Sequence, residues 1–340
     1  MWVAIEESAR WLTPPLLTAY GLALAFGMAL RWPRAAPWLA CACSAPVAAS
    51  LLLVPASSPP LRALAAVFGM DVILKMIDAS RRAGEYANGR QGWLRYLRFL
   101  CPVPVLLATG EERALTLRSR PPKGPALLLA VSGTVAFAAC WQAVVWLHDS
   151  PLLRSSFVLD HVVKVAFAGV CLRVCSEMLT GWERLAGYDS QPPLNRIELS
   201  RTPAEFWLRH NRRVQAWLSR NVFRPAGGLR HPAWGVVLVF AVSGLLHEVM
   251  FDLAMSRIDG CQLAFFVLQI PAVLLSPALE RFLRGGGWRT SAARVLTFLW
   301  IAASSVLFFR GVGIIFPFAY SGGPISPPFG EWRWDAAAPP

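Results

Sequence analysis

Residues 126–147 read ALLLAVSGTVAFAACWQAVVWL, an uncharged run that decides the class of fold. As an α-helix this run is about 33 Å long, and the hydrocarbon core of a bilayer is about 30 Å thick. A second apolar run, LLTAYGLALAFGMAL, occupies residues 16–30. Of the 340 residues 16% are charged, against about 25% in a soluble domain, and the mean hydropathy is +0.45. The sequence therefore predicts an all-α, polytopic integral membrane protein with a single membrane domain over residues 1–340.

The apolar segments predict about eight transmembrane helices. Segment 93–108 is interrupted by prolines, and we expect it to be re-entrant or interfacial. Residues 317–340 are rich in proline and are expected to form a tail. The eight expected spans cover residues 13–31, 35–55, 60–77, 124–147, 155–180, 232–252, 261–280 and 295–316.

Basic residues predict the orientation of these spans. Nine Lys or Arg lie in residues 81–123, nine in 181–230 and four in 281–294, whereas the alternate connections carry one each. Because basic residues are enriched in cytoplasmic connections, we expect these three segments inside and both termini outside.

The net charge of +13 is explained by those connections, so membrane lipids are expected partners and nucleic acid is not. All but three of the 33 basic residues are arginine, which is typical of a GC-rich genome, and the inner (cytoplasmic) membrane of a bacterium is the expected location. The seven cysteines lack zinc-site spacing, and no metal is expected.

Residues 202–225, TPAEFWLRHNRRVQAWLSRNVFRP, stand apart from the apolar runs. Thr202 is a good N-cap, Pro203 suits the first helical position, and Glu205 can complete a capping box. The pattern predicts one amphipathic helix from Thr202 to about Phe223, lying at the membrane surface. Its apolar stripe would hold Trp207, Asn211, Val214, Leu218 and Val222, and its opposite face, turned to water and headgroups, Arg209, Arg212, Arg213, Arg220 and Arg224.

Asn211 is the one amide in that apolar stripe. A buried amide without partners costs about 1–3 kcal/mol, so its presence needs a reason. It either caps a neighbouring segment or bonds across helices, or it faces a polar site inside the protein. The nearby His210 and His231 are expected to be interfacial.

His247 and Glu248 form a second polar intrusion, deep in the span at 232–252. Ionisable residues inside a membrane helix usually face a cavity or pathway. Ser243 lies one turn before His247 on the same face. Histidine suits general-base work near neutral pH, and the alternative is a histidine that only packs against a neighbouring helix.

The other ionisable residues of the spans are expected to be structural. His148 is expected to be a solvated loop residue. Three oppositely charged pairs at i,i+4 spacing are expected to bond internally: Asp71–Lys75, Asp160–Lys164 and Arg173–Glu177.

The segment EFWLRHNRRVQAWLSRNVFRP followed by SGLLHE resembles the membrane-bound O-acyltransferase (MBOAT) family, and in particular its wax-synthase-like branch. That branch has a segment of the type FW-x-R-x-[HN] before a span containing SG-x-x-HE. The specific resemblance covers residues 185–252. The chain departs from the plant wax-synthase pattern in having LRHN where those proteins have GRRW followed by Asn or His.

The resemblance implies a transfer of an acyl group from acyl-CoA to the hydroxyl of a lipid or other acceptor. It implies no cofactor, with acyl-CoA as the co-substrate, and no metal. It matches His247 and Asn211 to the catalytic pair. The expected substrate-binding residues are Phe206, Trp207, Arg209, Arg212, Arg213, Ser243 and Glu248.

Two other readings stay open. A transporter-like or non-catalytic membrane protein would line a pathway with its polar residues and often shows internal repeats, which are not evident in this sequence. A membrane prenyltransferase would need Asp-rich clusters for magnesium pyrophosphate, and the sequence has no DxxxD or DDxxD run.

Overall fold

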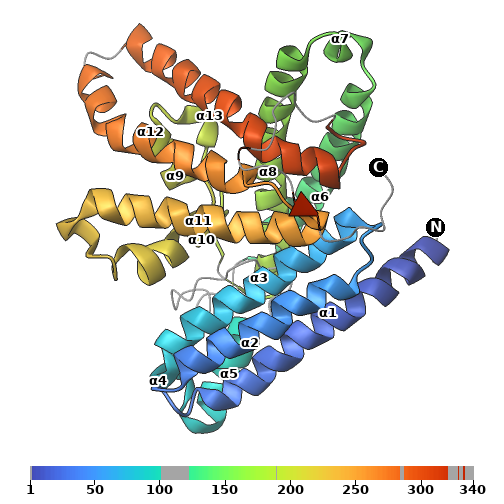
Figure 1. The fold of residues 1–340 in the computed structure, drawn as a ribbon, viewed down its shortest axis with the longest axis vertical. Coiled ribbons are helices and arrows are strands. Elements are labelled where there is room, and N and C mark those ends of the chain that lie inside the picture. The colour runs from blue at the N-terminus through green and yellow to red at the C-terminus, as the bar shows by residue number, and fades with distance from the viewer. Residues whose placement is uncertain are drawn as a thin grey trace. The chain divides into compact units, whose positions relative to one another are not determined.

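The computed structural model describes residues 2–100, 122–188, 190–283, 287–320, 328 and 332–333 (Figure 1). These residues are overwhelmingly α-helical, in agreement with the predicted all-α class. The chain divides into two compact units. The first comprises Met1–Thr116, Val249–Asp259 and Glu331–Pro340, and the second comprises Leu117–Glu248 and Gly260–Gly330.

The first unit is built on α1, α2, α3 and α5, with the short α4 between the last two. A short antiparallel pair joins β1 to β2, with Arg257 opposite Arg333. The bounds are α1 Trp2–Ala29, α2 Ala36–Ser50, η1 Leu51–Leu53, α3 Pro59–Arg81, α4 Ala83–Tyr86, α5 Gly89–Leu100, β1 Arg257–Ile258 and β2 Trp332–Arg333.

Glycine at position 27 allows α5 to pack closely on α1. A Cβ atom added at Gly27 would lie 2.6 Å from a ring carbon of Tyr96, so no larger side chain fits without displacement. The Tyr96 hydroxyl donates a hydrogen bond of 2.7 Å to the carbonyl of Ala23. Close packing and this bond together hold the aromatic face of α5 against α1.

The second unit contains the long helices α6, α8, α12 and α13, the first part of α11, and the short elements between them. The bounds are α6 Lys123–His148, α7 Pro151–Arg154, α8 Phe157–Leu185, η2 Ile197–Leu199, α9 Pro203–Arg209, α10 Arg212–Leu218, the π-helical turn η3 Ser219–Phe223, η4 Gly228–Arg230, α11 Pro232–Met255, α12 Cys261–Leu283 and α13 Trp288–Ile315.

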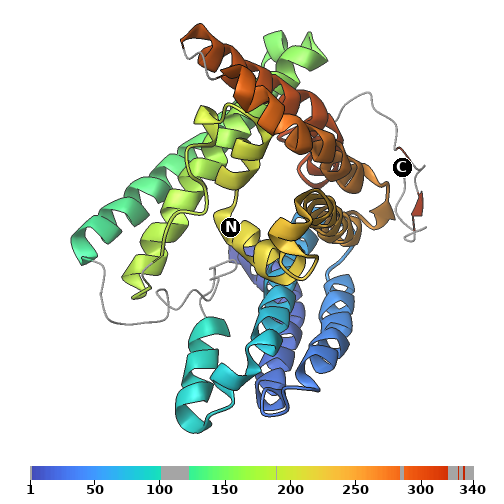
Figure 2. The same ribbon diagram turned by 90° about the vertical axis from the view of Figure 1, so that its left-hand side faces the viewer.

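Helices α6 and α8 form a tight antiparallel pair (Figure 2). A Cβ atom at Gly133 would lie 2.7 Å from the Cα of Met178, and one at Gly181 would lie 2.6 Å from the Cα of Ala130. Small residues at such contacts let helix backbones approach closely, which is the usual way that helices associate within a membrane.

Six helices in the described part of the chain are long and apolar enough to cross a membrane. The expected spans at 60–77 and 155–180 are helical, in α3 and α8, but these helices carry several charged residues, so the count of eight is not confirmed. Residues 93–100 lie in α5, and the rest of segment 93–108 falls outside the described residues. The six helices are Glu6–Ala29, Ala36–Leu53, Lys123–His148, Pro232–Met255, Cys261–Leu283 and Trp288–Ile315.

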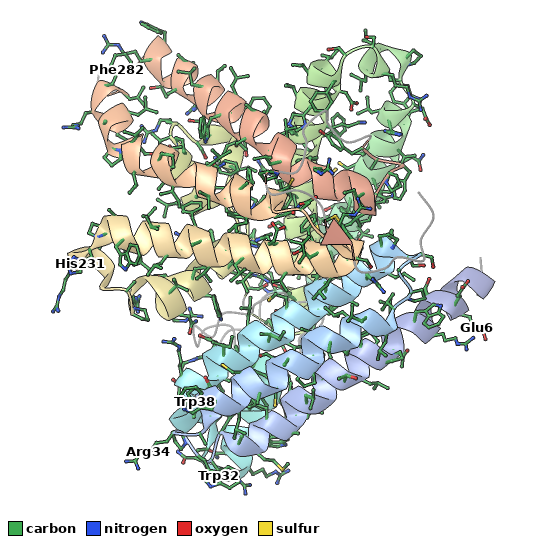
Figure 3. The ribbon with its side chains drawn as sticks, in the orientation of Figure 1. Glu6, Trp32, Arg34, Trp38, His231 and Phe282 are labelled. Carbon is green, nitrogen blue, oxygen red and sulfur yellow. The ribbon has the colours of Figure 1, made fainter. Side chains whose placement is uncertain are left out.

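Exposed tryptophans lie near the ends of several of these helices. Trp32 and Trp38 flank the turn between α1 and α2 and are 61% and 79% exposed (Figure 3). Trp146, Trp234 and Trp288 lie near the ends of α6, α11 and α13 and are also exposed. Tryptophan is enriched at membrane–water interfaces, so their placement fits helices that end there.

The three predicted i,i+4 ion pairs are confirmed. The oppositely charged atoms are 2.7 Å apart in Asp71–Lys75, 2.8 Å in Asp160–Lys164 and 3.3 Å in Arg173–Glu177. The expectation for His148 is wrong. This residue ends α6, and its Nδ1 accepts a hydrogen bond of 3.1 Å from the Lys164 ammonium, because the antiparallel pairing of α6 and α8 brings the two together.

The expected orientation can be tested with single cysteines at exposed positions. Asn88→Cys and Gln191→Cys lie in the basic segments expected inside, and Ser155→Cys lies at the end of the span 155–180 that is expected to face outside. A charged maleimide added to intact cells should label position 155 above the background of the unmodified chain, but not 88 or 191. Strong labelling at 88 and 191 together with none at 155 would show that the orientation is the reverse of the expected one.

Candidate functional site

Helix α9 begins as predicted. The Thr202 hydroxyl accepts a hydrogen bond of 3.2 Å from the Glu205 amide, and Pro203 occupies the first helical position. The Glu205 carboxylate turns back, but it accepts from the amide of Arg201, at 2.8 Å, instead of closing the box on Thr202. These bonds are local, which is why the sequence was sufficient to predict them.

The single helix expected from Thr202 to Phe223 is wrong. It breaks after Arg209, and α10 starts at Arg212. The backbone groups that a continuous helix would pair internally are taken by a preceding loop. The amide of Asn195 donates to the carbonyl of Arg209 at 3.0 Å, and the amide of Arg212 donates to the carbonyl of Pro193 at 2.8 Å.

Asn211 lies at the break in a left-handed conformation, with φ of 42°. Asparagine adopts this conformation more readily than most residues. Its side-chain oxygen accepts a hydrogen bond of 3.3 Å from the amide of Val214 and so caps α10. Among the described residues, its Nδ2 group has no hydrogen-bond partner. Of the two readings of Asn211, the cap is therefore present, and one donor group remains unused.

His210, at the break, lies in an aromatic cluster. Its ring stacks on that of Phe206, with the ring centroids 5.4 Å apart, and meets that of Trp207 edge-on, with the centroids 5.5 Å apart. Trp207 in turn contacts Phe240 of α11 at 5.3 Å and Phe266 of α12 at 5.5 Å. The Nδ1 atom of His210 is shielded from solvent in this cluster. His231, by contrast, is exposed at the start of α11 (Figure 3).

His247 enters the same cluster from α11. Its ring lies 4.5 Å from that of Phe266 and 5.9 Å from that of Phe308 in α13. The Nδ1 atom is 2.8 Å from the carbonyl oxygen of Ser243. A carbonyl can only accept, so Nδ1 carries the proton and, in the neutral ring, Nε2 has the free lone pair. Ser243 thus contributes its backbone carbonyl to the site.

The two histidines lie near enough to influence each other electrostatically. Burial, reinforced by the charge of His247, lowers the pKa of His210 to about 4. His210 is therefore neutral at pH 7. In the described part of the chain, its Nδ1 atom and the Nε1 atom of Trp207 are shielded from solvent and have no hydrogen-bond partner. Such groups are rare in native proteins and call for an explanation.

Glu248 is engaged by the backbone at the start of α12. Its two carboxylate oxygens accept hydrogen bonds from the amides of Gly260, at 2.6 Å, and Leu263, at 2.8 Å. A carboxylate at a helix N-terminus is stabilised by the unpaired amides and by the helix dipole. Glu248 therefore holds the start of α12, next to Phe265 and Phe266, and its oxygens are occupied.

The arginines of the motif differ in their surroundings. Arg209 bonds to Glu205 at 2.7 Å and to two carbonyls of the preceding loop. Arg213 forms a bidentate ion pair with Glu183 of α8, with N–O distances of 2.6 Å and 2.5 Å. Both side chains are largely buried. The expectation that these arginines face water holds for the exposed Arg212 and is wrong for Arg213.

The structure thus brings Phe206, Trp207 and His247 together and adds His210, Phe266 and Phe308, which sequence reasoning did not assign to the site. The sequence did carry one signal for His210. It stands directly before Asn211, where the wax-synthase-like pattern has tryptophan. Of the expected residues outside the cluster, Arg209, Arg213 and Glu248 are held by other partners, Asn211 caps α10, and Arg212 is exposed.

In the described residues, no group of three or more His, Cys, Asp or Glu is placed to hold a metal ion. Neither a model of any protein family nor any curated protein matches the sequence. The likeness to membrane-bound O-acyltransferases therefore rests on the sequence motifs alone.

Two adjacent arginines allow a matched test of how much the Arg213–Glu183 ion pair stabilises the fold. Arg213→Gln leaves Glu183 buried without its cation, a change that costs about 3–5 kcal/mol in comparable pairs. Arg212→Gln alters an exposed side chain and should change stability by no more than about 0.5 kcal/mol. Thermal unfolding of the purified protein in detergent should show a much lower melting temperature for Arg213→Gln alone. Equal melting temperatures would mean that the Arg213–Glu183 pair does not hold α10 to α8.

Proposed function

We propose that this protein is a membrane O-acyltransferase that moves an acyl group from acyl-CoA to an alcohol hydroxyl, as wax-ester synthases do. The observation that carries the proposal is the state of His247. Its Nδ1 proton is committed to the carbonyl of Ser243, and its Nε2 lone pair belongs to a ring surrounded by aromatic side chains. A histidine in that state is suited to act as a general base.

The reaction needs such a base because an alcohol is a weak nucleophile at neutral pH. His247 Nε2 removes the hydroxyl proton as the alcohol oxygen bonds to the thioester carbonyl carbon. When the carbon–sulfur bond breaks, the CoA thiolate takes that proton from the imidazolium. The ester and CoA are released, and His247 returns to its neutral form.

The surroundings suit lipid substrates. Long apolar helices provide an environment for a fatty acyl chain, and we propose that α3 and α8 cross the membrane with the six most apolar helices, in the inner membrane of a bacterium. The phosphates of CoA need cations on the cytoplasmic side, where the exposed Arg212 would lie. The family resemblance matches Asn211 to the catalytic pair, and in the structure its side-chain oxygen caps α10.

A transporter-like function would use the buried charges of α3 and α8. These charges are Asp71 and Lys75 in α3, and Asp160 and Lys164 in α8. Each acid is paired with a base one turn away in its own helix, which favours a structural role for them over a pathway.

Replacement of His247 by glutamine tests the proposal. Glutamine keeps hydrogen-bonding capacity but cannot accept a proton near pH 7, so acyl transfer should fall by about 10²–10⁴-fold. The assay follows labelled palmitoyl-CoA in membranes given short-chain, long-chain and sterol alcohols, normalised to folded protein. His231→Gln, the same change at an exposed histidine, should keep wild-type activity.

Two results would count against the proposal. If wild-type membranes form no ester with any alcohol beyond membranes lacking the protein, the activity is wrong. If wild type is active and His247→Gln retains its turnover, the histidine is structural and the mechanism is wrong.

A further inference from the structure

The proposed acyl transfer needs, besides the base, a hydrogen-bond donor that stabilises the oxyanion formed from the thioester carbonyl. The identity of that donor rests on the proposed function. The motif resemblance points to Asn211. The structure points to its neighbour. We propose that His210, as a neutral imidazole, donates the hydrogen bond that stabilises the oxyanion, with the indole N–H of Trp207 as a second donor.

The backbone at the break separates the roles of the two adjacent residues. His210 is extended, with φ of −82° and ψ of 125°, whereas Asn211 is left-handed, with φ of 42° and ψ of 64°. Asn211 consequently directs its side-chain oxygen to the first turn of α10. The ring of His210 instead contacts those of Phe206 and Trp207, in the cluster that also contains His247.

Two buried polar atoms in this cluster have no acceptor or donor among the described residues, namely His210 Nδ1 and Trp207 Nε1. An indole nitrogen can only donate, so its one possible partner is an acceptor. The centroids of the two rings are 5.5 Å apart, and the proposal has one small acceptor bound by both groups. A thioester carbonyl oxygen that becomes an oxyanion is such an acceptor, and its negative charge strengthens both bonds.

The protonation state of His210 suits a donor that keeps its proton. Burial and the charge of His247 lower the pKa of His210 to about 4, so the ring is neutral at pH 7 and carries one N–H. A neutral imidazole is a poor acid. It therefore stabilises negative charge by a hydrogen bond without giving up the proton, whereas an imidazolium would protonate the oxyanion.

The two histidines then have distinct tasks in one balanced step. The alcohol oxygen bonds to the carbonyl carbon, and its proton passes to Nε2 of His247. The carbonyl π electrons move to oxygen, which is held by the N–H groups of His210 and Trp207. When the oxyanion re-forms the carbonyl, the carbon–sulfur bond breaks and the thiolate takes the proton from His247. His210 and Trp207 end as they began.

The test compares two replacements of His210. Phenylalanine keeps an aromatic ring beside Phe206 but has no N–H, and removing an oxyanion donor lowers kcat by about 10²–10³-fold. Asparagine places an amide N–H near the position of Nδ1. We expect His210→Phe to lose kcat to that extent with KM for palmitoyl-CoA nearly unchanged, and His210→Asn to recover at least about tenfold of it.

Asn211→Gly discriminates between the two neighbours. Glycine accepts the left-handed backbone and is a fair N-cap, so this change removes the amide and leaves the chain path intact. It should lower kcat much less than His210→Phe does. If Asn211→Gly loses more than His210→Phe, or if His210→Asn is no better than His210→Phe, His210 is not the donor.

Melting temperatures of the purified variants separate folding from chemistry. If His210→Phe does not fold, Trp207→Phe removes the second donor while keeping an aromatic ring, and it should lower kcat at least about tenfold with KM little changed. A folded Trp207→Phe with wild-type kcat would contradict the two-donor arrangement.

The outcomes distinguish this inference from the proposed function. Wild-type protein without any acyl transfer overturns both. Active wild type, inactive His247→Gln and fully active His210→Phe overturn only the role of His210. His231→Phe, an equivalent change at an exposed histidine, should match wild type throughout.

Discussion

The candidate site depends on two backbone hydrogen bonds that the break makes with Pro193 and Asn195 of the preceding loop. They occupy the carbonyl of Arg209 and the amide of Arg212, which an uninterrupted helix would pair internally. A helix that loses these pairs has to end, and Asn211 supplies both the left-handed turn and the cap that start the next one. The break redirects the chain after His210, whose ring contacts Phe206 and Trp207 at the end of α9.

Buried carboxylates hold the elements around that break. Glu183 of α8 binds Arg213 of α10, and Glu248 of α11 binds two amides at the start of α12. In both cases the carboxylate is taken from water and is compensated by two hydrogen bonds, as a buried charge requires. These carboxylates therefore stabilise the packing of the helices, and the polar groups within the aromatic cluster are the uncharged rings of His210, His247 and Trp207.

The two histidines of the cluster differ in the partners that their ring nitrogens have. His247 has its Nδ1 proton fixed by a carbonyl of its own helix, so its free nitrogen is an acceptor. His210 has a buried Nδ1 without a partner in the described residues, beside an indole N–H in the same condition. One basic nitrogen and nearby N–H donors in an apolar setting are the groups that an addition to a carbonyl requires. The proposed acyl transfer and the proposed role of His210 both follow from this difference.

The sequence by itself determined the helical, membrane-type class, the start of α9 at Thr202 and the three i,i+4 ion pairs. Each depends on apolar length or on residues within one turn, and such local interactions form whatever the rest of the chain does. The tertiary structure alone decided the break at His210, the partner of Arg213 and the role of Glu248. Their partners lie 12 to 30 residues away, and a helical periodicity contains no information about them. Asn211 was expected in an apolar stripe because that stripe was drawn for a continuous helix. In the structure the helix ends before Asn211, and the polar residue in the aromatic cluster is His210.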